Sequence, residues 1–139
     1  MDVKDFYSFL LSHLYTGHGW HCILWDIVSE ERTKIVKDFE EAVAEKGICS
    51  VTNIDVAHLG SSEFENMLPK SDIEEPSVVF VHNVEDATPG IWACLHLYMK
   101  EKTDLSHLSP SCCIVVFGNS ANHKWCDPGI TTSVAHFNL

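Results

Sequence analysis

The hydrophobic positions of the chain follow two patterns, short continuous apolar runs and longer stretches with helical spacing. Runs such as Cys22–Trp25 and Val78–Val81 are typical of strands that are buried on both faces. Between the runs, apolar residues recur every three or four positions, which predicts helices that each bury one face. The predicted helices are Asp2–Tyr15, Ser29–Lys46, Ser62–Leu68 and Pro89–Lys100, and the predicted strands are Cys22–Trp25, Ile48–Val56, Ser77–Val84, Cys112–Phe117 and Ser133–Phe137.

Local signals mark where these elements begin, and their order predicts the fold class. Ser29 is expected to be the N-cap of its helix, and Ser62 to open a capping box with Glu65. The helix Pro89–Lys100 is apolar nearly all round, so we expect it to be covered on two sides. Strands that alternate with helices imply a parallel sheet. The sequence therefore predicts one α/β domain, residues 1–139, a three-layer sandwich with a mainly parallel sheet of four to five strands.

The net charge of the chain limits the classes of partner that we expect it to bind. The 139 residues carry a net charge of −11, and Arg32 is the only arginine. Nucleic acids and anionic membrane surfaces attract basic proteins, so we expect neither as a partner. No apolar run is long enough to span a bilayer, and the acidic N-terminus does not resemble a signal peptide. The chain could equally be a domain of a longer protein.

The first strand and its helix have the strand–loop–helix setting in which P-loop proteins bind phosphate. In the template G-x-x-x-x-G-K-[ST], Asp26 takes the first glycine position and Glu31 the second. Arg32 and Thr33 take the lysine and hydroxyl positions. The loop has no glycine, and Asp26, Glu30 and Glu31 place negative charge where phosphates would lie. The strand–loop–helix order is typical of a nucleotide site, whereas the side chains exclude a nucleotide. An accidental match of the template to an ordinary α/β junction is the alternative explanation.

Two further nucleotide-site motifs follow in the expected order. The strand Val78–Val81 resembles a Walker-B strand, but His82 and Asn83 stand where two acids are needed for magnesium and water. A shifted acid at Glu85 or Asp86 is a weaker alternative. Asn119, at the end of the last predicted core strand, takes the place of the first sensor of AAA+ proteins or is a simple loop asparagine.

Together these motifs resemble a P-loop NTPase of the AAA+ type that has lost nucleotide binding, and most of all the torsin activators of the lamina-associated polypeptide family. The resemblance covers Cys22–Lys102 by pattern: a strand entering an acid-rich helix without glycines (Ile23–Ala44), a strand ending in Ile54-Asp55, and an acid-free strand followed by an apolar helix (Val78–Lys102). It implies a location in the lumen of the endoplasmic reticulum or nuclear envelope; without it, the cytoplasm is the alternative.

The resemblance implies a non-catalytic module that needs no cofactor and regulates a protein partner, plausibly an ATPase. Torsin activators stimulate their ATPase with an arginine finger late in the domain, but no arginine follows Arg32 here. An inhibitor or scaffold therefore suits this chain better than an activator. Trp125, Asp127 and Pro128 form our expected partner-binding segment, because a tryptophan in a polar loop is a typical hot-spot anchor.

Three alternatives remain open from the sequence. Zinc could be bound jointly by His18, His21 and Cys22 and by His123 and Cys126, but a parallel sheet is expected to place these two groups at opposite ends, so we expect no metal site. The six cysteines fit no disulfide scaffold, and reduced thiols are expected. A small enzyme could use His82, His58 or Cys126, although no nucleophile motif is present and Cys94 lies in an apolar helix. The third alternative is a relic of a viral-type helicase.

Overall fold

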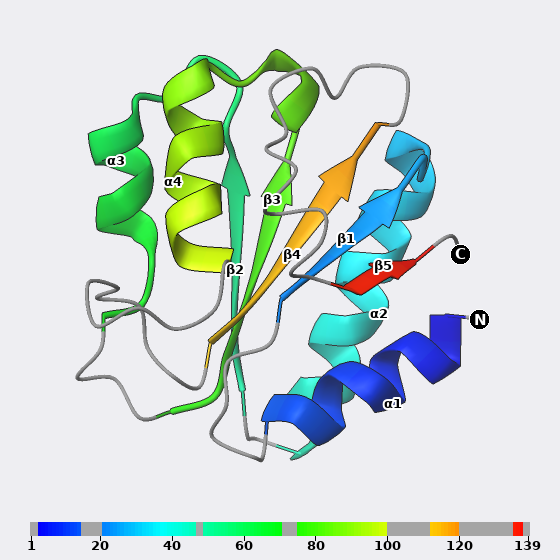
Figure 1. The fold of residues 1–139 in the computed structure, drawn as a ribbon. Helices are drawn as coiled ribbons and strands as arrows, with labels where there is room; N and C mark the ends of the chain where they lie inside the picture. Colours follow the sequence, from blue (N-terminus) through cyan, green and yellow to red (C-terminus); the bar gives the residue numbers. More distant parts are fainter. Residues whose placement is uncertain are drawn as a thin grey trace.

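The computed structural model describes residues 3–14, 21–46, 49–70, 75–99, 112–119 and 135–137. Its elements are α1 (Val3–Leu14), β1 (Cys22–Trp25), α2 (Ser29–Lys46), β2 (Ser50–Asp55), α3 (Ser61–Met67), β3 (Ser77–His82), the 3₁₀ turn η1 (Val84–Asp86), α4 (Pro89–Met99), β4 (Cys112–Gly118) and β5 (Ala135–Phe137). All paired strands run parallel, in the order β2-β3-β4-β1-β5 (Figure 1). The predicted α/β fold with a parallel sheet of four to five strands is confirmed.

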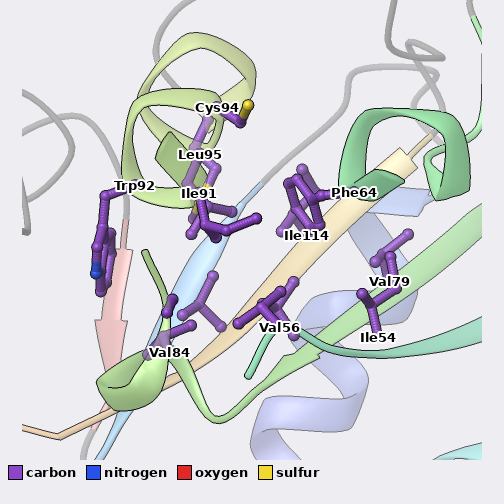
Figure 2. Close-up of a cluster of buried hydrophobic side chains, with 14 of the residues drawn as sticks. Ile54, Val56, Phe64, Val79, Val84, Ile91, Trp92, Cys94, Leu95 and Ile114 are labelled. Carbon is purple, nitrogen blue, oxygen red and sulfur yellow. The ribbon is translucent and has the colours of Figure 1, made fainter. Parts of the chain in front are cut away.

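Strand β4 lies in the middle of the sheet and contributes to both hydrophobic cores. All its residues are buried, and successive side chains point to opposite faces. Ile114 and Val116 join the core under α3 and α4, whereas Val115 and Phe117 join the core under α1 and α2. Figure 2 shows the first of these cores, with α4 packed over the strands. The molecule is thus a three-layer sandwich, and each layer of helices covers one face of the sheet (Figure 1).

Two predicted helix caps are displaced by one or two residues. Helix α2 begins at Ser29, and the Arg32 N–H donates to the Val28 carbonyl at 2.9 Å, so Val28 takes the N-cap position expected for Ser29. Helix α3 begins at Ser61 after Gly60, whose N–H donates to Glu63 Oε1 at 3.4 Å. The predicted box around Ser62 is therefore displaced, because Glu63 rather than Glu65 reaches back to the cap.

Helix α4 packs on one face of the sheet and beside α3, and among the described residues its outer face is exposed, so it is covered less completely than we expected. Its inner face buries Ile91 and Leu95 against the strands (Figure 2). On its outer face Ala93 is exposed and Leu97 is 38% exposed. In the part of the chain that the structure describes, no helix is both long enough and apolar enough to cross a membrane. The five cysteines in that part are free thiols.

Candidate functional site

The turn between β1 and α2 keeps a glycine-like backbone where the P-loop template has its first glycine. Asp26 has a φ of 57°, in the left-handed region that glycine adopts without strain. Its N–H donates to the Gly118 carbonyl at 3.0 Å, which ties the turn to the end of β4. A Cβ on Gly118 would lie 3.0 Å from side-chain atoms of Ile23 and Trp25, so any other residue would require these side chains to move. The scaffold of the turn is P-loop-like, but its first side chain is a carboxylate.

The β1–α2 turn, Asp26–Val28, is too short to wrap a phosphate. In the template, the helix follows a complete glycine-rich loop whose N–H groups surround the anion. Here α2 begins at Ser29, so residues 29–31 already form the first helical turn. Glu30 and Glu31 are exposed in that turn and favour the helix dipole, but they repel a polyphosphate. The loop that would cradle a triphosphate is therefore replaced by helix.

Arg32 holds the β1–α2 turn in place through three contacts. Its Nε donates to the Ile27 carbonyl at 2.6 Å, and its Nη1 lies 3.7 Å from Glu85 Oε1. Its guanidinium carbon lies 5.7 Å from the centre of the Phe117 ring, within cation–π range. The Arg32 side chain is only 11% exposed, so these contacts are shielded from solvent. At the template's lysine position, the cation of this chain binds its own backbone and a carboxylate.

A cavity of about 380 Å³, the first cavity, opens beside Arg32. It is lined by Asp26, Ile27, Val28, Ser29, Arg32, Glu85 and Asn119. Three stretches that are far apart in sequence thus meet here: the P-loop-like turn, the acid after β3 and the amide after β4. Of the two shifted acids considered from the sequence, Glu85 reaches this cavity and Asp86 does not line it.

The two Walker-B positions, His82 and Asn83, do not line the first cavity. The His82 ring stacks on Phe117, with ring centres 5.1 Å apart and planes at 27°. Its Nε2 lies 3.0 Å from Asn53 Oδ1, and Asn53 Nδ2 donates to Glu40 Oε1 at 3.1 Å. Because an amide oxygen only accepts, His82 carries its proton on Nε2. Burial and the positive charge of Arg32 lower the pKa of His82.

Asn83 adopts a left-handed conformation and stabilises a neighbouring carboxylate. Its φ is 63°, which asparagine tolerates better than most residues. The Asn83 side chain and the Ala57 N–H hydrogen-bond the Asp55 carboxylate and lower its pKa. Asn83 is thus engaged with Asp55 at the end of β2, and as an amide it does not supply the carboxylate of a Walker-B motif.

A second cavity, of about 280 Å³, lies between α2 and strands β2 and β3. It is lined by Thr33, Val36, Lys37, Glu40, Asn53 and His82. Thr33, at the template's hydroxyl position, lines this cavity rather than the first, and its Oγ1 donates to the Ser29 carbonyl at 3.1 Å. The residues aligned with the P-loop lysine and hydroxyl therefore face different cavities.

His21, one of the proposed zinc ligands, has a structural partner. Its Nδ1 accepts the Ile114 N–H at 3.0 Å, and burial lowers its pKa to about 4. Within the described ranges, no three histidine, cysteine or acidic side chains gather in a way that would hold a metal ion. His18, His123 and Cys126 lie outside those ranges, as does the expected partner segment with Trp125, Asp127 and Pro128.

The other residues weighed for an enzyme do not converge. His58 is exposed on the loop after β2, with a φ of 62°. The buried Cys94 Sγ donates to Glu65 Oε1 at 3.3 Å, and burial raises the pKa of this thiol to about 11. A thiol with so high a pKa is protonated at neutral pH and a poor nucleophile.

No motif in the sequence singles out Phe117 or Asn53. Phe117 is contacted by both Arg32 and His82. Its place could have been predicted from the alternation of side chains along β4, which puts Phe117 on the face of the sheet that α2 covers. Asn53 becomes relevant only through the register in which β2 pairs with β3, which places Asp55 beside His82. Nothing in the local sequence indicates that register.

Comparisons with known proteins support the fold. No protein-family model matches the sequence, and no curated protein matches it. Among solved structures, the chain is similar to an AAA+ chain in the structure of Drosophila ORC bound to AT-rich DNA and Cdc6, with a TM-score of 0.63 and 12% sequence identity. The match covers 98% of this chain and 53% of that chain, so this chain spans about half the length of its neighbour. The fold is AAA+-like, whereas the resemblance to torsin activators stays a prediction.

Proposed function

We propose that this chain is a non-catalytic, AAA+-like module that binds another protein, in particular an ATPase, and alters its turnover or assembly. It would act as a pseudo-subunit, occupying the place of an active neighbour without hydrolysing nucleotide, as the resemblance to torsin activators implies. No cofactor and no metal ion takes part in this mechanism. The absence of any arginine after Arg32 favours inhibition or scaffolding over activation.

One observation carries this proposal: Arg32 is committed to the protein's own groups. A P-loop lysine acts because its charge is available to the phosphates. The charge of Arg32 is instead shared between the Ile27 carbonyl and Glu85. A nucleotide would have to break these contacts and also overcome the repulsion of Asp26 beside the cavity. An AAA+-like fold with such a turn is better suited to binding proteins than to binding ATP.

The surface around the turn has features of a protein-binding site. Val28 is 63% exposed at the tip, and the side chains of Asp26, Glu30 and Glu31 are exposed around it. We name these four residues the turn surface. An apolar centre with an acidic rim suits a partner that presents a hydrophobic contact and basic side chains. The DNA in the ORC structure belongs to that complex, and a net charge of −11 disfavours DNA as a ligand here.

Reversing one charge on the turn surface is expected to weaken partner binding. Glu30→Lys should lower capture of a P-loop ATPase from a native lysate about tenfold, because it replaces a favourable rim contact with a repulsive one. Glu41→Lys is the matched control: Glu41 is also exposed on α2 but lies three turns further along the helix. Quantitative mass spectrometry of proteins bound to the immobilised wild type and both variants provides the comparison.

Two results would contradict the proposal. One is that no ATPase is enriched by the wild-type chain over an empty matrix. The other is that Glu30→Lys and Glu41→Lys lower capture of the ATPase equally, which would indicate a general effect of charge rather than binding through the turn surface.

A further inference from the structure

A continuous series of contacts joins the two cavities through the face of the sheet under α2. Glu85 pairs with Arg32 beside the first cavity, and Arg32 lies over the Phe117 ring. The same ring is stacked against His82, whose Nε2 is bonded to Asn53 in the wall of the second cavity. Phe117 is fully buried between its two neighbours. A change in the charge of His82 therefore acts on the environment of Arg32.

We propose that protonation of His82 weakens the hold of Arg32 on the β1–α2 turn, so that the turn surface responds to pH. The consequence of this inference is that a partner binds differently at acidic pH, and this consequence rests on the proposed function. Its structural part, the link between His82 and Arg32, concerns the isolated chain and is tested without a partner.

The hydrogen bonds of His82 determine where the added proton goes. Neutral His82 carries a proton on Nε2, which is donated to Asn53 Oδ1, so a second proton is added at Nδ1. The bond to Asn53 survives this step, because a charged imidazole still donates from Nε2. What changes is the charge: two cations, His82 and Arg32, then contact one aromatic ring. They repel each other, and both draw on the negative charge of the same ring.

Other charges near His82 act in both directions. The groups that face it or its contacts are Arg32, Lys37 and Glu40 from α2, Asp55 from β2, His58 from the loop after β2, and Glu85 from η1 through Arg32. Asp55 favours the protonated ring, whereas Arg32 and burial oppose it. The balance keeps the pKa of His82 below its ordinary value of 6.5, so the response is expected in mildly acidic solution rather than at neutral pH.

The single arginine makes this link directly measurable. Arg32 gives the only arginine Nε–H signal in a ¹H–¹⁵N spectrum, and its Nε–H is the donor to the Ile27 carbonyl. In a pH titration of the isolated wild-type chain, the Arg32 Nε–H frequency is expected to shift with the same midpoint as the His82 ring carbon signals. In His82→Asn, whose side chain does not titrate, this component of the Arg32 shift is expected to disappear.

Controls separate His82 from other titrating groups. His21→Asn removes another histidine and should leave the pH dependence of the Arg32 Nε–H frequency unchanged. Glu85→Gln removes the anionic partner of Arg32 and should leave in place the component of the Arg32 shift that follows His82. An Arg32 signal that stays constant while His82 titrates in the wild type would overturn the proposal, and this comparison needs no variant. An unaltered Arg32 titration in folded His82→Asn would overturn it equally. Failure to capture an ATPase would refute the proposed function and leave the link between the two residues intact.

Discussion

Replacing Phe117 with alanine is expected to lower the free energy of unfolding by about 4 kcal/mol. The ring is fully buried in the middle strand of the sheet, 5.9 Å from the ring of Phe80 and nearly parallel to it. It also contacts the His82 ring and the Arg32 guanidinium. Alanine would leave a cavity and would remove the aromatic face on which Arg32 rests. The loss is therefore expected to affect both the core and the β1–α2 turn.

Urea denaturation followed by circular dichroism measures the effect of Phe117→Ala on stability. Phe117→Leu is the matched control: it keeps most of the apolar volume but removes the aromatic ring, and should cost about 1 to 1.5 kcal/mol. A loss below about 1 kcal/mol for alanine would show that the site collapses without strain and that Phe117 does not organise this face.

Acidification is expected to destabilise the chain through His21, by about 3 kcal/mol between pH 8 and pH 4. Burial lowers the pKa of His21 from 6.5 to about 4 in the folded chain, where Nδ1 accepts the Ile114 N–H. Above pH 6.5 the ring is neutral in both states, and its contribution is fully present. As pH falls below 6.5 the unfolded chain takes up the proton and the folded chain does not, so stability declines until pH reaches about 4.

His21→Asn isolates this contribution from other titrating groups. The asparagine Oδ1 can accept the Ile114 N–H in place of Nδ1, but it does not titrate. Urea denaturation at several pH values measures the unfolding free energy of wild type and variant. As the pH falls, the variant is expected to become more stable relative to the wild type. If that difference is constant from pH 8 to pH 4, His21 is not held neutral by the fold.

The periodicity of apolar residues was sufficient to predict the layers of this fold. The all-apolar runs in β3 and β4 indicate strands buried on both faces, and the helical spacing in α2 indicates a helix with one buried face. Strand order could not be predicted, because β1 lies between β4 and β5, two consecutive strands that are far from it in sequence. The exposure of Leu97 was missed because an apolar outer face on α4 has the same pattern as a buried one.

At the candidate site, the sequence located the positions but not their contacts. The template placed Asp26 and Arg32 at the β1–α2 turn, and Asn119, noted at the end of the last core strand, lines the same cavity. The pairing of Arg32 with Glu85 was not foreseen, because it depends on the 3₁₀ turn η1 that follows β3. The separation of His82 from the first cavity was not foreseen either, since it depends on stacking against Phe117.

Whether the β1–α2 turn binds a nucleotide can be measured by isothermal titration calorimetry of the isolated chain with Mg-ATP. Because Arg32 binds the Ile27 carbonyl and Glu85, and acids surround the first cavity, we predict no saturable heat at nucleotide concentrations up to about 1 mM, a binding free energy weaker than about −4 kcal/mol. Saturable binding with a micromolar Kd that is lost in Arg32→Ala would contradict this prediction, because it would mean that Arg32 leaves its own partners to bind phosphate.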